Sequence, residues 1–427
     1  MNKRSFLKST LLTGMGAAMS MEALAAVFKS VADHSPEQLA GDDAFWLAIR
    51  RQYLLKPDYI NLENGYYNFI PQPLLEKYIA HIREVNYQGA WYMRNHAVEN
   101  KKKVTAKLAE LVGCSAEEIA ITRNTTESLD IVLAGKHWQA GDETIMAEQD
   151  YGSIMEMLRH VSARYGVVNK VVSVPNHPAS DEEIVSLYAD AITPRTKLIL
   201  VSHIINITGQ ILPIRKICDM AHARGVEVCV DGAHAIAHFQ FRIPDLNCDY
   251  YGSSLHKWLS APLGAGLLYV KKEKMPDLWP LIVGWEKDPN KILRISHTGT
   301  HPSATDLTIS DSIDYYHMIG AERKEARLRY LQQYWTSRVR QHPGIVLNTP
   351  ADPRRACGIA NVGIKGIPPS DLAKRLLEEH RIYTVAIDGA NVHGCRITPN
   401  VFTTTKELDR FVAALKQLAG SHIHYIG

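Results

Sequence analysis

Short apolar runs alternate with amphipathic segments through the middle of the chain. Runs rich in valine, isoleucine and leucine are typical of strands that are buried on both faces of a parallel sheet. Segments with apolar residues three and four positions apart predict helices between those strands. We therefore expect an α/β domain whose mostly parallel sheet is covered by helices on both faces. The predicted strands are 118–122, 143–148, 168–174, 197–203, 226–230 and 266–270, and the predicted helices are 125–134, 151–165, 181–191 and 215–224.

The pattern changes after about residue 305, where fewer strands lie among the helices. Two long helices are followed by short strands and a last helix, which suggests a small α+β domain. The helices are predicted at 309–319, 321–340, 370–379 and 405–418, and the strands at 358–364, 382–387 and 395–398. The predicted division is an export signal (1–25), an N-terminal linker and helix (26–60), a large domain (61–304) and a small domain (305–427).

Composition excludes several classes of protein. The chain has 427 residues, of which 46% are hydrophobic, which is enough for one large and one smaller core. The formal net charge is +3, and the basic run Lys101–Lys103 lies on a helical pattern, so nucleic acid is not an expected partner. The six cysteines show no C-x-x-C or Cys/His ligand spacing, so we predict neither a disulfide framework nor a metal site.

The N-terminal 30 residues have the features of an export signal. A basic head is followed by a short apolar stretch (11–18) and by Ala23-Leu24-Ala25, an A-x-A cleavage pattern. The apolar stretch is too short to span a membrane. Residues 2–8 resemble a twin-arginine signal with Lys3 in place of the first arginine. We expect a periplasmic protein without membrane association beyond export, with an ordinary Sec signal or an uncleaved N-terminus as the alternatives.

The candidate chemistry lies between residues 226 and 270. The strand 226–230 ends at Asp231, and Lys257 precedes the next strand, 266–270. Taken singly, an Asp-Gly is more often a turn, and a lysine in a loop is more often a solvated charge. Together, an acid and a lysine at strand ends suit pyridoxal 5'-phosphate (PLP). The lysine binds the aldehyde as a Schiff base, and the acid keeps the pyridine nitrogen protonated.

Two motifs carry a family resemblance. D-G-A-H-A at 231–235 and S-S-L-H-K-W-L-S-A-P-L-G-A-G-L-L at 253–268 resemble the class V aminotransferases, and within them the isopenicillin N epimerase-like branch. The resemblance extends over roughly residues 55–420. It implies PLP-dependent fold type I, with a large domain built on a mostly parallel, seven-stranded-type sheet and a small C-terminal domain.

The resemblance also implies which residues bind the cofactor. Thr125 and Thr126 begin a predicted helix, where exposed N–H groups favour a phosphate, although a simple helix cap is the alternative. Tyr151 is the candidate for stacking on the pyridine ring, with Gln149 and Asp150 as alternatives. Thr300 matches a segment that reaches the phosphate of a neighbouring subunit, which implies a homodimer. Ser254 and His256 match the family's phosphate-side ligands. Asn206 matches the residue that binds the cofactor's phenolic oxygen, and His234 can reach the same edge, beside Asp231 and Lys257.

The substrate residues are implied in the same way. Arg396 lies in a run that resembles the family's carboxylate-binding segment, and a guanidinium pairs with a carboxylate through two parallel hydrogen bonds. Asn64 and Gly65 match a loop that lies over the active site in the family. Cysteine desulfurases of the family carry a nucleophilic cysteine upstream of the arginine, but residues 383–394 contain none. Cys395 should point away from Arg396, because neighbours on a strand alternate.

These features predict a PLP-dependent enzyme that acts at the α-carbon of an amino acid or amino-acid-derived substrate. If the proton returns to the other face of the α-carbon, the enzyme is an epimerase. If the proton goes to the cofactor carbon instead, the enzyme is an aminotransferase. A carbon–sulfur lyase, which expels a β-leaving group, is the alternative. A non-catalytic binding protein of the same fold is disfavoured by the presence of both Asp231 and Lys257.

Overall fold

The computed structural model describes residues 21–423 and divides into two compact units. The sheet unit contains residues 77–206 and 210–314, and the terminal unit contains 21–76, 207–209 and the chain from 315 onward. The division passes through α5 (Gln72–Gln88) and α13 (Ser303–Ile319). These two units do not coincide with the domains predicted from the sequence. The predicted domain bounds remain a prediction.

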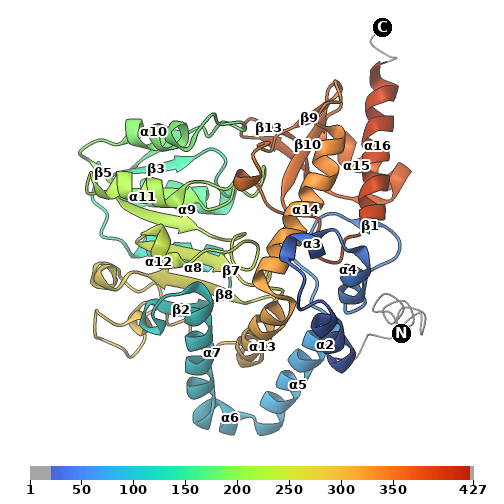
Figure 1. Cartoon of the computed structure of the whole chain (residues 1–427). Coiled ribbons are helices and arrows are strands. Elements are labelled where there is room, and N and C mark those ends of the chain that lie inside the picture. The colour runs from blue at the N-terminus through green and yellow to red at the C-terminus, as the bar shows by residue number, and fades with distance from the viewer. Residues whose placement is uncertain (1–20, 424–427) are drawn as a thin grey trace. The chain divides into compact units, whose positions relative to one another are not determined.

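The sheet unit is built on a seven-stranded sheet with the order β2-β8-β7-β6-β5-β3-β4 (Figure 1). β8 is antiparallel to both of its neighbours, and the other pairs are parallel. The predicted, mostly parallel sheet is therefore confirmed. The strands are β2 (Ile119–Thr122), β3 (Glu143–Ala147), β4 (Val168–Val172), β5 (Thr196–Ser202), β6 (Glu227–Asp231), β7 (Tyr250–Ser254) and β8 (Gly266–Val270).

Apolar side chains cover both faces of this sheet. Leu198 and Leu200 of β5 belong to a core cluster that also holds residues of the helices α8 and α9. Ile199 and Val201 alternate with them and are equally buried, so they fill the opposite face. The helices are α6 (Ala90–Asn95), α7 (Ala97–Val112), α8 (Thr125–Gly135), α9 (Gly152–Tyr165), α10 (Asp181–Ala191), α11 (Ile214–His222) and α12 (Ile243–Leu246).

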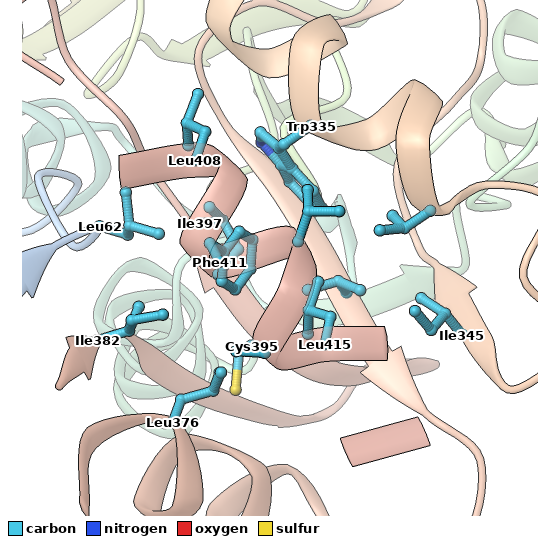
Figure 2. Close-up of a cluster of buried hydrophobic side chains, with 14 of the residues drawn as sticks. Leu62, Trp335, Ile345, Leu376, Ile382, Cys395, Ile397, Leu408, Phe411 and Leu415 are labelled. Carbon is cyan, nitrogen blue, oxygen red and sulfur yellow. The ribbon is translucent and has the colours of Figure 1, made fainter. Parts of the chain in front are cut away.

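The terminal unit has a four-stranded antiparallel sheet with the order β12-β13-β10-β9 and a parallel pair, β1 and β11. Its core holds Trp335, Phe411 and Cys395 (Figure 2). The sequence pattern missed β9, because three residues are too few to show a period. The strands are β1 (Ile60–Asn61), β9 (Ile345–Leu347), β10 (Ala360–Ile364), β11 (Ile382–Tyr383), β12 (Val385–Gly389) and β13 (Val392–Ile397). The helices are α2 (Met21–Ser30), α3 (Pro36–Ala40), α4 (Asp43–Arg50), α14 (Ala321–Val339), α15 (Pro369–His380) and α16 (Thr405–Ile423).

Two findings concern the predicted export signal. Residues 1–20 lie outside the described part of the chain, whereas the proposed cleavage pattern at Ala23–Ala25 lies within α2. Among residues 21–423, no helix is long and apolar enough to cross a membrane.

Candidate active site

Asp231 and Lys257 lie at the carboxyl edge of the parallel strands. Asp231 is the last residue of β6, and Lys257 follows the last residue of the neighbouring β7 by three positions. Ligands bind at this edge in open α/β sheets. The carboxylate of Asp231 is buried, and burial raises its pKa, while a hydrogen bond from the Ala233 N–H and the charge of Lys257 act to lower it. A buried carboxylate of this kind favours a cationic partner.

Gly232, directly after Asp231, allows the strand to end in close contact with its neighbour. A Cβ at this position would overlap the ring of Tyr251 on β7. The Gly232 carbonyl also accepts a hydrogen bond from Ser253 Oγ at 2.8 Å. The Asp-Gly pair is therefore required by packing, in addition to any role of the carboxylate.

Lys257 contacts a buried histidine. Its Nζ lies 2.9 Å from Nε2 of His234, and the indole Nε1 of Trp258 donates to Nδ1 of the same histidine at 3.3 Å. The ring of His238 stacks on Trp258 with the centroids 3.7 Å apart and the planes at 11°. The sequence indicated His234, but it did not indicate Trp258 or His238, although Trp258 is adjacent to Lys257.

Hydroxyl and N–H groups gather at the start of α8. The N–H of Thr125 donates to Ser254 Oγ at 2.9 Å, and the two hydroxyl oxygens are 2.7 Å apart. Asn124 caps the helix by accepting from the Glu127 N–H at 2.8 Å. Gly266 keeps the backbone close, since a Cβ there would lie 2.5 Å from the Asn124 nitrogen.

Thr126 and His256 complete the predicted phosphate set. Thr126 lies in the first turn of α8, where N–H groups point out of the helix. The Nδ1 of His256 is buried and has no hydrogen-bond partner among the described residues. Burial and the neighbouring charge of Lys257 lower the pKa of His256 to about 4, so the ring is neutral at pH 7. This unsatisfied nitrogen suits a ligand that supplies a partner.

These features of the sheet unit fit PLP. The buried carboxylate of Asp231 suits a protonated pyridine nitrogen, and the Lys257 amine suits an aldehyde. The N-terminus of α8, with Thr125 and Ser254, suits a phosphate. Each of these groups was predicted from the sequence, and the structure brings Thr125 and Ser254 into contact across 129 positions of the chain.

Two of the remaining predicted cofactor residues, Tyr151 and Asn206, follow strands whose carboxyl ends lie at this edge of the sheet. Tyr151 is 43% exposed at the start of α9, whereas Gln149 is turned toward the end of β4, where its Oε1 accepts from the Val174 N–H. Asn206 lies in the loop after β5 that is closed by the bridge between Ile204 and Ile211. Thr300 is exposed. Their roles toward the cofactor stay predictions.

Asp150 connects the carboxyl ends of the strands β3 and β5. Its Oδ1 accepts from Ser202 Oγ at 2.7 Å, and its Oδ2 accepts from the Ala147 N–H at 2.8 Å. Burial, with a smaller contribution from the charge of Asp231, raises the pKa of Asp150 to about 7. Sequence reasoning considered Asp150 only as an alternative stacking residue, because its partner on β5 is 52 positions away.

The terminal unit brings the three predicted substrate residues together. Arg396 on β13 forms a buried bidentate pair with Glu63, with Nε donating to Oε2 at 3.2 Å and Nη2 to Oε1 at 2.5 Å. A Cβ on Gly65 would lie 3.0 Å from the guanidinium carbon. Asn64 donates to the Thr398 carbonyl at 2.7 Å. The sequence did not indicate Glu63, although it directly precedes Asn64.

Cys395 points away from Arg396, as predicted. Its side chain is fully buried in the core of the terminal unit, and its Sγ contacts the Pro369 carbonyl at 3.7 Å. Burial raises the pKa of this thiol to about 11. The residues before it form the antiparallel pair β12–β13, with Ala390 and Asn391 in left-handed conformation at the turn. None of the six cysteines forms a disulfide, and between residues 21 and 423 no group of three His, Cys, Asp or Glu side chains could hold a metal ion.

Comparison with known proteins shows similar sequences and folds. A model of the family described as Aminotransferase class-V matches residues 70–411. An isopenicillin N epimerase of Streptomyces clavuligerus is 27% identical over 394 residues, which cover 88% of this chain and 99% of that protein. A cysteine desulfurase of Haloferax volcanii is 24% identical over 341 residues, 75% of this chain and 78% of that protein. The apo structure of a cysteine desulfurase from Thermococcus onnurineus NA1 matches with a TM-score of 0.77 at 20% identity, covering 87% of this chain and 98% of the other.

Proposed function

Because this chain belongs to the class V aminotransferase family of PLP-dependent enzymes, we propose that it removes and returns the α-proton of an amino-acid substrate, as an epimerase does. The arrangement of Lys257 and Asp231 carries the proposal. They lie at one edge of the sheet, at and just after the ends of the neighbouring strands β6 and β7. The epimerase of Streptomyces clavuligerus, which aligns over 99% of its length, favours this reaction among those of the family.

Each protein group has a defined task in this reaction. Bound PLP supplies an electron-withdrawing ring that makes the α-proton of an attached amino acid acidic. Asp231 holds a proton on the pyridine nitrogen, and the Nζ of Lys257 accepts the α-proton as a general base. For inversion, a second group must deliver a proton to the opposite face, and Tyr151 is the side chain that we assign to this task. Arg396 binds the substrate carboxylate through its guanidinium.

The structure disfavours a persulfide-forming reaction. A desulfurase needs an accessible thiolate near the substrate sulfur. Cys395 is fully buried with a raised pKa, and residues 383–394 contain no cysteine. We therefore propose that the protein does not act through a protein persulfide.

The first prediction is that Lys257 carries the cofactor. Borohydride reduction of the holoenzyme, followed by peptide mapping, should place a pyridoxyl group on Lys257. The Lys257→Ala variant should lose this label and about 10²–10⁴-fold of its activity. Lys271→Ala, which changes a lysine at the end of β8 in the same unit, should keep both. A label on any other lysine would refute the assignment.

The second prediction concerns the fate of the α-proton. In D₂O, amino-acid substrates should gain deuterium at the α-carbon and invert, as followed by NMR and chiral chromatography. Tyr151→Phe should still exchange the proton but should no longer invert the centre. Pyruvate or sulfide formation would instead indicate the carbon–sulfur lyase, and loss of the amino group would indicate a transaminase; either result would overturn the epimerase assignment.

We also propose that the protein is a homodimer. A segment of the sheet unit exposes large apolar side chains, including Val283 at 70% and Trp285 at 94%. Exposed apolar clusters of this kind are typical of protein interfaces. The segment lies shortly before Thr300 in the sequence. Thr300 is the residue implied to reach a neighbouring subunit's phosphate. A second copy of the chain is therefore the partner that we infer for this surface.

The third prediction tests the dimer by light scattering after size-exclusion chromatography. Wild-type protein should have the mass of two chains, and Trp285→Glu with Val283→Glu should shift it toward one chain. Leu54→Glu, which replaces an equally exposed apolar residue of the terminal unit, serves as the control and should leave the mass unchanged. A wild-type monomer at micromolar concentration would contradict the proposal.

A further inference from the structure

His234 lies between two groups that together determine which of its ring nitrogens carries a proton. On one side, Trp258 Nε1 is 3.3 Å from Nδ1, and on the other, Lys257 Nζ is 2.9 Å from Nε2. An indole N–H can donate a hydrogen bond but cannot accept one. The Nδ1 of His234 must therefore accept and carries no proton.

This assignment determines the direction of the hydrogen bond to the lysine. A neutral imidazole has one N–H, so with Nδ1 unprotonated the proton is on Nε2. That N–H points at Lys257 Nζ, which must then accept the hydrogen bond through its lone pair. An ammonium group has three N–H donors and no acceptor, so it would place a second donor against the Nε2–H with no acceptor between them. An imidazolium would carry a proton on Nδ1 as well, and this N–H donor would face the indole N–H donor.

We propose that Trp258 is a positioning residue that holds His234 as its Nε2–H tautomer and thereby favours the uncharged amine of Lys257. The uncharged amine is the form that can attack a carbonyl and accept a proton. The inference deepens the proposed function, because its importance depends on Lys257 being the cofactor lysine. The tautomer itself is a property of the chain without cofactor.

The packing around Trp258 keeps the indole in this position. Trp258 and His234 are almost fully buried, at 1% and 3% exposure. His238 stacks on the indole, and its Nδ1 donates to the His234 carbonyl at 2.8 Å. His238 therefore contacts both the backbone of His234 and the ring face of Trp258. These two contacts keep the indole N–H directed at Nδ1 of His234.

Another charged group also acts on Lys257. The carboxylate of Asp231 at the end of β6 attracts the ammonium form of the lysine, whereas His256 in the same turn is neutral at pH 7. Both are present in wild-type protein and in variants of Trp258. A comparison of these proteins therefore isolates the effect of the indole N–H.

The first experiment is NMR of cofactor-free protein with ¹⁵N-labelled histidine. Wild-type protein should show His234 as the Nε2–H tautomer near pH 7, with the signal assigned by its loss in His234→Gln. In Trp258→Phe, which keeps an aromatic ring for His238 but has no N–H, the signal should move toward the other tautomer or the imidazolium. An Nδ1–H tautomer or an imidazolium in wild-type protein would overturn the proposal, even if the variant does not fold.

The second experiment measures the pH dependence of Lys257 acetylation by acetic anhydride, with the peptide quantified by mass spectrometry. Trp258→Phe should raise the midpoint by about one pH unit, the shift that corresponds to loss of one hydrogen bond. Trp335→Phe is the matched control. Trp335 is a fully buried tryptophan of the terminal unit whose Nε1 has no partner among the described residues, and this variant should leave the Lys257 midpoint unchanged.

The outcomes separate this proposal from the proposed function. An unchanged tautomer and midpoint in Trp258→Phe would refute the role of Trp258 while borohydride still labelled Lys257. A borohydride label on another lysine would refute the function of Lys257, even with the tautomer confirmed.

Discussion

Arg396 and Glu63 are buried together, so a change to one affects the other. The side chains are 8% and 6% exposed and form two parallel hydrogen bonds. Removing one member of a buried ion pair leaves the other charge without compensation, which costs about 3–5 kcal/mol. Replacing both members by well-packed apolar residues of similar volume is often nearly neutral. Stability and substrate binding can therefore be separated by mutation.

The fourth prediction is that Arg396→Ala loses both stability and substrate affinity, and that replacing Glu63 as well restores only the stability. Arg396→Ala should lower the free energy of unfolding by about 3–5 kcal/mol and weaken substrate binding about 10–150-fold through the lost charge-assisted pair. Arg396→Met combined with Glu63→Leu should recover most of the stability but not the affinity. Urea unfolding and substrate titration measure the two effects. Unchanged affinity in both variants would remove Arg396 from the substrate site.

At the scale of secondary-structure elements, Asp150 connects the ends of β3 and β5. In the folded chain its pKa is about 7, against an ordinary value of 3.8, because the carboxyl is buried. Between about pH 4 and pH 7 the folded protein therefore holds a proton that the unfolded chain has released. The free energy of unfolding falls as the pH rises through this window, by up to about 1.4 kcal/mol per pH unit.

His203 has the opposite effect. Burial lowers the pKa of its ring to about 3, so the unfolded chain binds the extra proton below pH 6.5. This group makes the free energy of unfolding rise with pH between about 3 and 6.5. In wild-type protein the two slopes partly cancel, so Asp150 must be isolated by a difference between variants.

The fifth prediction is the pH dependence of Asp150→Asn. In cofactor-free protein, the free energy of unfolding of wild type minus that of Asp150→Asn should fall as the pH rises from about 4 to about 7, and should then level off. Urea unfolding at half-unit pH steps measures this difference. A flat difference would mean that Asp150 is ionised throughout, with a pKa near its ordinary value.

At the scale of the whole molecule, the predicted export signal overlaps the folded helix α2. The proposed cleavage after Ala25 would divide α2 and remove Leu24, which is fully buried. Burial of a leucine contributes about 1.5–3 kcal/mol, so the precursor would be more stable than the mature chain. We propose that the mature protein begins near Ala26 in the periplasm. Cell fractionation with N-terminal sequencing tests this proposal, and a cytoplasmic protein that retains Met1 would contradict it.

Local sequence was enough to predict most strands and helices of the sheet unit and its candidate reactive groups, but β7 was not among the predicted strands. The helix 181–191 and the strand 266–270 were predicted with the bounds that the structure shows. Asp231 and Lys257 could be singled out because both lie at the ends of apolar runs, and hydrophobic period and strand ends are properties of consecutive residues. The short strand β9 was missed for the same reason, since three residues carry no measurable period.

Only the tertiary structure decided which side chains meet. Thr125 reaches Ser254 because β2, β8 and β7 are neighbours in the sheet, and Arg396 meets Glu63 across 333 positions. The orientation of Trp258 toward His234 depends on the turn after β7 and on the stacked ring of His238. Such contacts depend on strand order and on packing between distant segments, and neither is encoded in the spacing of neighbouring residues. The sequence by itself therefore indicated the candidate reactive groups of this protein, and the fold determined which side chains they contact.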